Sequence, residues 1–153
     1  MNNKFRIGTA ALVAVLFLSQ GCAKRPPAIV SVSGTVTLND LPLPHAEISF
    51  IPMEPGLDGN YIATAITDEN GFYTLVLPAK PGAVVGVNKV TVTDGPLPDE
   101  ARGQDGESQM IASRFLASLK NRPIPTSYGL ASQTSLSVTV TPEQTEYNLT
   151  LKR

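Results

Sequence analysis

The sequence predicts an all-β domain, a β-sandwich of seven strands with one short helical insertion. Val, Ile and Thr together supply 35 of the 153 residues, and these β-branched side chains suit a pleated surface better than a helix. Several stretches alternate apolar and polar residues with period two, which is typical of half-buried strands. Clusters of Gly, Pro, Asn and Asp separate these stretches at intervals of about ten residues, as in folds built from two antiparallel sheets.

The first 21 residues read as an export signal. Lys4 and Arg6 precede a 12-residue apolar run from position 7 to 18, which is shorter than the roughly 20 residues that span a bilayer. The pair Gly21-Cys22 then resembles the end of a bacterial lipobox, in which the Cys receives a diacylglycerol thioether. The alternative is a cleaved signal followed by an incidental Cys. We therefore expect a lipoprotein signal peptide over 1–21, lipidation at Cys22, a tether over 22–29 and a domain over 30–153.

The first two strands of the domain are predicted from strict alternation. Residues 30–38 place Val and Leu on one face and Ser and Thr on the other. Gly34 falls on the apolar face, where a missing side chain allows a close approach or a bulge. Asn39-Asp40 begins a turn, and the second strand places Ala46, Ile48 and Phe50 on its apolar face before Pro52 ends it.

Turn residues separate the later strands. Residues 61–67 and 72–77 flank Asp68-Glu69-Asn70-Gly71, which predicts a hairpin because Asn and Gly accept the positive φ angles of such turns. Residues 84–93 form the predicted fifth strand. Two more strands, at 136–140 and 147–151, close the chain.

Residues 97–121 interrupt the strand pattern and are predicted to be a helical insertion. The apolar residues of 107–120 recur at helical spacing, Asp105 is placed to cap the first turn, and Pro123 stops the helix. We expect Met110, Ile111, Phe115 and Leu119 to pack on the sandwich. A helix that binds a partner is the alternative.

Three segments in order carry a resemblance to a known family. Residues 32–38 fit the pattern V-x-G-x-V-T-L, residues 67–73 fit T-D-x-x-G-x-Y, and residues 124–128 fit I-P-x-x-Y. Together with residues 43–50, these segments resemble the carboxypeptidase regulatory-like domain over about residues 30–151, and most of all its lipoproteins in planctomycete-type bacteria. The resemblance implies a transthyretin-like (prealbumin-like) or immunoglobulin-like sandwich with a non-enzymatic, extracytoplasmic role. The insertion at 97–121 departs from the family's pattern.

The composition excludes much catalytic chemistry. A formal net charge of −1 gives no electrostatic reason to expect nucleic-acid binding. One Cys and one His leave no material for a multi-ligand zinc site or a disulfide framework. Asp68, Glu69 and Asn70 could ligate calcium, but Asp68 as the cap of a turn is the preferred interpretation. His45 and Glu47 could form an acid/base pair, but no motif places a nucleophile beside them, so we expect an exposed His, no enzyme activity, no metal and no cofactor.

The functional prediction is a lipid-anchored module with a binding or structural accessory role in a bacterial cell envelope. It would contact the membrane through its N-terminal lipid, face the periplasm or the exterior, and meet an envelope protein or glycan. The alternative is a carbohydrate- or peptide-binding envelope domain that uses the 53–60 and 97–121 loops. Tyr61 and Tyr128 are the candidate surface aromatics for such binding.

Overall fold

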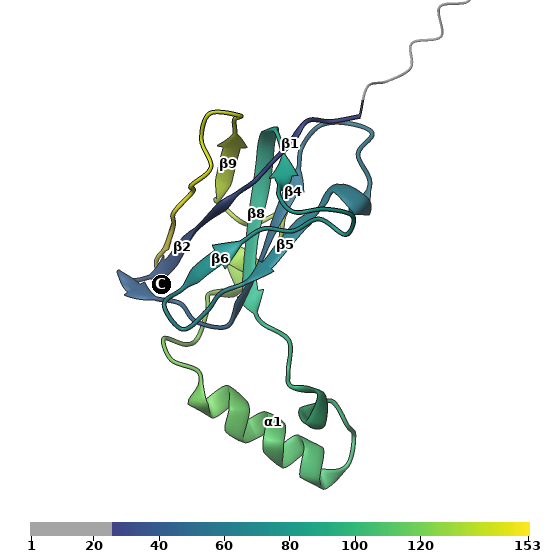
Figure 1. The fold of residues 1–153 in the computed structure, drawn as a ribbon. Coiled ribbons are helices and arrows are strands. Elements are labelled where there is room, and N and C mark those ends of the chain that lie inside the picture. The colour runs from purple at the N-terminus through teal and green to yellow at the C-terminus, as the bar shows by residue number, and fades with distance from the viewer. Residues whose placement is uncertain (1–25) are drawn as a thin grey trace, which may run out of the picture.

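The computed structural model describes residues 26–153, which form a mainly-β domain with one α-helix (Figure 1). Three single turns of 3₁₀ helix lie between the strands: η1 (Gly59–Tyr61), η2 (Asp99–Ala101) and η3 (Thr126–Gly129). The α-helix is α1 (Gly106–Ser118). The described strands, in chain order, are β1 (Ile29–Val30), β2 (Ser33–Leu38), β3 (Leu41–Pro42), β4 (Ala46–Pro52), β5 (Ala63–Ile66), β6 (Phe72–Thr74), β7 (Ala83–Val84), β8 (Gly86–Asp94), β9 (Ser137–Val140) and β10 (Leu149–Leu151).

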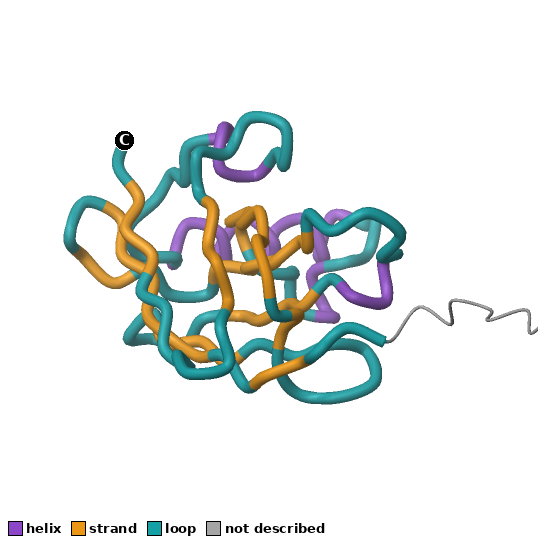
Figure 2. The backbone as a smooth tube through the Cα atoms, turned by 90° about the horizontal axis from the view of Figure 1, so that it is seen from above, coloured by secondary structure: helices purple, strands orange, loops and turns teal. Residues whose placement is uncertain are grey.

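The strands form two four-stranded sheets and one short two-stranded sheet. One large sheet has the order β5-β4-β8-β9, and all its neighbours are antiparallel. The other has the order β10-β2-β3, with β6 also paired to β2, and its β10–β2 pairing is parallel. Strands β1 and β7 make the third sheet. Seen from above, the strands gather at the centre and the loops run around them (Figure 2).

Both large sheets contribute to one hydrophobic core, because their strands alternate as the sequence predicts. In β2 the inward side chains of Val36 and Leu38 are fully buried, and Ser33, Thr35 and Thr37 are half-buried. Fully buried side chains of the other sheet complete the cluster, among them Ile48, Phe50, Val90 and Val92. The mainly-β class is thereby confirmed. The count of seven strands and the sandwich type stay predictions.

The structure divides two of the predicted strands. Residues 30–38 are not one strand, because β1 pairs with β7 whereas β2 pairs with β3, β6 and β10. The turn at 68–71 is present, with the Gly71 N–H donating to the Asp68 carbonyl at 3.0 Å. The two predicted segments do pair across it, because the Asp68 N–H donates to the Phe72 carbonyl at 2.9 Å and Thr64 and Val76 exchange backbone hydrogen bonds at 2.9 Å. The main partners of the two arms differ, however, since β5 pairs with β4 and β6 with β2, so the turn also carries the chain from one sheet to the other. The predicted strand at 84–93 is also two strands. Gly86 has φ +124° and marks the break. Before this residue the chain pairs with β1, and from it onward the chain pairs with β4.

Gly34 permits a close backbone approach in the core. A Cβ atom built on Gly34 would lie 1.9 Å from the carbonyl oxygen of Tyr147. The buried phenol of Tyr73 donates a 2.6 Å hydrogen bond to the same oxygen. Burial, followed by the neighbouring Tyr147, raises the pKa of Tyr73 far above its usual range, so this phenol stays protonated and remains a donor. The predicted role of Gly34 in a close approach is therefore confirmed.

Candidate functional site

A hollow of about 550 Å³ lies at the end of the molecule where α1 leaves the strands. Three segments that are distant in the sequence build its walls: the chain before β4, the turn between β5 and β6, and the end of α1. This size falls within the roughly 300–1,000 Å³ of ligand pockets in proteins. The lining residues are Pro44, His45, Thr67, Asp68, Glu69, Asn70, Phe115, Ser118, Leu119 and Lys120.

The turn wall is shaped by Asp68. Its Oδ1 accepts hydrogen bonds from the backbone N–H of Asn70 at 2.8 Å and of Phe72 at 2.9 Å. This is an Asx-type turn in which the carboxylate satisfies the local backbone. Asp68 therefore caps the turn, as expected, and the exposed side chains of Glu69 and Asn70 lie on its rim. Within residues 26–153, no three His, Cys, Asp or Glu side chains cluster as metal ligands would.

His45 is half-buried, although the sequence predicted an exposed side chain. Its backbone φ of 52° and the start of β4 one residue later turn the ring toward the insertion. Its Nε2 lies 3.0 Å from the carbonyl oxygen of Pro96, rather than against Glu47. The ring packs edge-to-face with Phe115 of α1, at a centroid distance of 4.9 Å and an interplanar angle of 84°. His45 therefore holds the helix against the strands.

Helix α1 begins as the sequence predicts and ends two residues earlier, at Ser118. The carboxylate of Asp105 caps it and accepts from the backbone N–H groups of Ser108 and Glu107. The bond from the Ser108 N–H, then the bond from the Ser108 hydroxyl, lower the pKa of Asp105.

The expected packing of the helix on the strands is found only in part. Ile111, Phe115 and Leu119 are half-buried, but Met110 and Leu116 are 49% and 46% exposed. Figure 1 shows the reason, because α1 projects below the sheets instead of lying across one of them.

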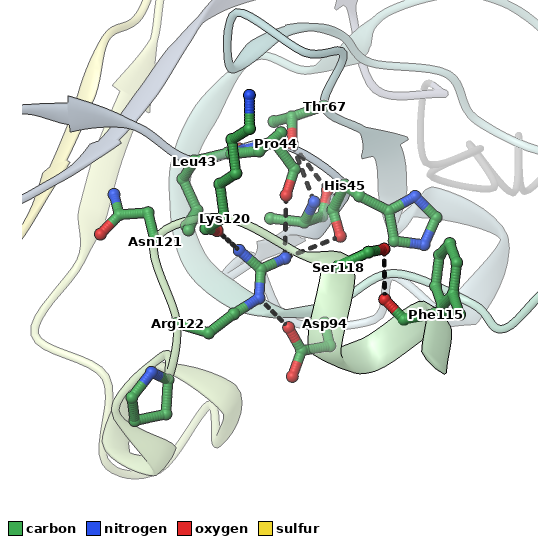
Figure 3. A network of polar contacts seen from close by, with 12 residues as sticks. Leu43, Pro44, His45, Thr67, Asp94, Phe115, Ser118, Lys120, Asn121 and Arg122 are labelled. Atoms are coloured by element: carbon green, nitrogen blue, oxygen red, sulfur yellow. Dashed lines mark hydrogen bonds and ion pairs between the residues drawn. The ribbon is translucent and has the colours of Figure 1, made fainter. Parts of the chain in front are cut away.

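Arg122 fastens the far end of the insertion to the strands (Figure 3). Its guanidinium pairs with the carboxylate of Asp94, at the end of β8. It also donates to three backbone carbonyl oxygens, those of Lys120 at 3.0 Å, Pro44 at 2.8 Å and His45 at 3.1 Å. The insertion is thus closed at its base by one side chain that contacts both of its flanks and the chain before β4.

Asn121 makes a second attachment. Its Nδ2 lies within hydrogen-bond distance of three carbonyl oxygens around the β2–β3 turn, those of Leu38 at 2.9 Å, Leu41 at 3.1 Å and Pro42 at 3.2 Å. Arg153 donates to the Oδ1 of Asn121 at 3.0 Å. Asn121 and Arg122 together therefore fix where the helix wall of the hollow stands.

Tyr61 and Tyr128, the candidate aromatics, lie apart from one another. Tyr61 ends η1 beyond the Pro52 end of β4, and the hollow lies beyond the Ala46 end of that strand. Tyr128 is half-buried, packs against the core, and exchanges hydrogen bonds with the backbone of Lys152 at 3.2 and 3.1 Å. The 53–60 and 97–121 loops likewise lie at opposite ends of the paired strands β4 and β8, so they do not form one site.

The residues that build the hollow were not singled out as a site from the sequence. One signal was available, because residues of opposite charge, Asp94 and Arg122, bracket the insertion. The predicted signal peptide over 1–21 and the lipidation site Cys22 lie outside the described residues. Within residues 26–153, no helix is long and apolar enough to cross a membrane.

Comparison with known proteins adds no relative: the chain matches no protein-family model, no curated protein and no solved structure.

Proposed function

We propose that this chain is a lipid-anchored, extracytoplasmic module of a bacterial cell envelope with a non-enzymatic binding or structural accessory role. The fold we propose is a transthyretin-like or immunoglobulin-like sandwich of the carboxypeptidase regulatory-like kind. Support comes from the three motifs and the lipobox pattern in the sequence, and from two four-stranded sheets that share one core. Cys22 is the proposed lipidation site.

The observation that carries a binding role is the position of the hollow. Strands β1 and β7 pair beside the Gly86 end of β8, whereas the insertion leaves from its Asp94 end, and Figure 1 shows β1 and α1 at opposite ends. Cys22 precedes Ile29 by seven residues, which span at most about 25 Å. A lipid at Cys22 would therefore hold the β1 end near the bilayer and leave the hollow facing away from it.

A non-enzymatic role is supported by the polar groups of the hollow. The Ser118 hydroxyl donates to the Phe115 carbonyl oxygen at 2.6 Å, and His45 is held by Pro96 and Phe115. A nucleophile with a base in reach is therefore not assembled among these residues. The second candidate, a carbohydrate- or peptide-binding envelope domain, is favoured by the mixed polar and apolar lining of the same hollow.

Membrane fractionation of cells that express the full chain or its Cys22→Ser variant tests the anchor. We expect the full chain in the membrane fraction at its processed size. The variant should be released into the soluble fraction or accumulate as an unprocessed precursor. A Cys22→Ser protein that stays membrane-bound at processed size would contradict the proposal.

A further inference from the structure

The rim of the hollow carries polar side chains that are free to form hydrogen bonds with a ligand. The side chains of Glu69, Asn70 and Lys120 are exposed, line the hollow and make no hydrogen bond or ion pair with any other residue of the described range 26–153. A carboxylate accepts hydrogen bonds, an ammonium donates them and an amide does both. The rim can therefore bind a ligand that has several donors and acceptors close together.

The deeper wall is apolar and aromatic. The ring of Phe115 stands against His45, and Leu119 and Pro44 line the hollow beside it. An aromatic ring and aliphatic side chains bury the C–H groups of a ligand without demanding hydrogen bonds. The ligand that fits both walls is amphipathic, with C–H groups on one side and hydroxyl groups around its edge.

We propose that this hollow binds a neutral saccharide of one or two sugar rings, with Phe115 against a ring face and Glu69, Asn70 and Lys120 on its hydroxyl groups. This inference rests on the proposed binding role and names the ligand class for it. A sugar ring has the required amphipathic shape, and its adjacent hydroxyls match a carboxylate, an amide and an ammonium placed on one rim.

Charge argues against an anionic ligand. Asp68 and Glu69 bring two carboxylates to the lining, against the single ammonium of Lys120. A phosphate or an acidic sugar would meet an excess of like charge there.

Peptides are disfavoured by the shape of the site. The strands reach the hollow only at their ends, in turns, so its lining offers no free sheet edge for an added strand and no continuous apolar groove for a helix.

Saturation-transfer NMR and calorimetry on the full, lipidated protein test this inference, in a detergent without a sugar head group. The probes are cellobiose and N,N′-diacetylchitobiose, with glucuronic acid and triglycine for comparison. We expect at least one neutral disaccharide to bind, and glucuronic acid and triglycine not to bind. Glu69→Ala and Lys120→Ala should each weaken that binding about tenfold or more, since each removes a charged hydrogen-bonding group.

Matched variants separate loss of contact from loss of fold. Phe115→Leu keeps an apolar side chain in the hollow and beside His45 but removes the aromatic face, so it should weaken binding while circular dichroism shows a chain that is still folded. Glu143→Ala removes an exposed carboxylate from the turn between β9 and β10 and should bind as the unaltered chain does.

Three outcomes overturn the inference. These are that no neutral disaccharide binds, that binding is unchanged in Glu69→Ala and Lys120→Ala, or that triglycine binds selectively, which would indicate a peptide site. In each case, membrane fractionation of the full chain and of Cys22→Ser tests the anchoring proposal separately. Failure of the saccharide inference can therefore be distinguished from failure of the anchoring proposal.

Discussion

The guanidinium of Arg122 and the carboxylate of Asp94 form an ion pair that closes the base of the insertion. Arg122 is only 14% exposed, whereas Asp94 is 49% exposed. The cation is therefore the buried member, and the backbone carbonyls of Lys120, Pro44 and His45 complete its partners. One side chain thus connects the two flanks of a long insertion to the chain that leads into β4.

Replacing Arg122 with Met should lower the free energy of unfolding by about 2–3 kcal/mol. The substitution keeps much of the aliphatic length but leaves the carbonyls of Pro44 and His45 without their charged donor. Urea unfolding followed by circular dichroism measures the change.

The control for this variant is Arg102→Met. Arg102 pairs with Asp99 at 2.8 Å, but both side chains are largely exposed, so the loss should stay below about 1 kcal/mol. Equal losses in the two arginine variants would mean that Arg122 does not fasten the insertion.

Replacing Gly34 with Ala should destabilise the core by about 3 kcal/mol or more, because the new methyl group would overlap the Tyr147 carbonyl. Neither backbone can shift freely, since the N–H of Tyr147 also donates to the carbonyl of Ser33 at 2.9 Å. The matched control is Gly59→Ala, whose Cβ would meet nothing within 4 Å. Thermal unfolding should show a much lower melting temperature for Gly34→Ala than for Gly59→Ala. Similar melting temperatures would contradict the close approach of Gly34 to Tyr147.

Replacing Phe50 or Leu75 with Ala should each cost about 2–5 kcal/mol through lost burial and the cavity left behind, since both side chains are fully buried. Truncation of Thr37 or Ser49, which point to the other faces of their strands, should change stability by no more than about 0.5 kcal/mol. Chemical denaturation of the four variants compares the two faces, and equal costs would show that the faces are assigned wrongly.

The start of α1 should depend on pH through Asp105. Its pKa is lowered in the folded protein, so its stabilising effect is complete above the unfolded-state pKa and is lost as the pH falls through the folded-state value. The protection factors of the Glu107 and Ser108 amide hydrogens, which correct the exchange rates for their intrinsic pH dependence, should fall under acidic conditions. In Asp105→Asn the cap is retained without a titrating group, so acid should have a much smaller effect. An identical acid response in both proteins would contradict this role.

Period-two alternation was enough to predict the strand faces. Val36, Leu38, Ile48 and Phe50 are buried as expected because each strand has one face toward the core and one toward solvent. The Asp105 cap and the Asp68 turn were also predictable, because both depend on contacts within four residues along the chain.

Pairing between distant strands was not predictable in the same way. The local pattern at 61–77 predicts a hairpin, and the arms do pair at Thr64 and Val76, but only the main partners of β5 and β6 show that the two strands also belong to different sheets. The same reason explains the missed hollow. His45 and Phe115 are 70 residues apart, and Arg122 lies 77 residues from the His45 carbonyl that it binds. Helical spacing identified an apolar stripe but could not show that the helix projects away from the sheets.

The most direct test of an anchored module whose hollow faces away from the membrane is mass spectrometry of the N-terminal peptide from membrane-extracted protein. Lipidation at Cys22 predicts a mature chain that begins at this residue and carries a diacylglycerol thioether on its sulfur. A mature chain that begins elsewhere, or one that begins at Cys22 with an unmodified thiol, would contradict it.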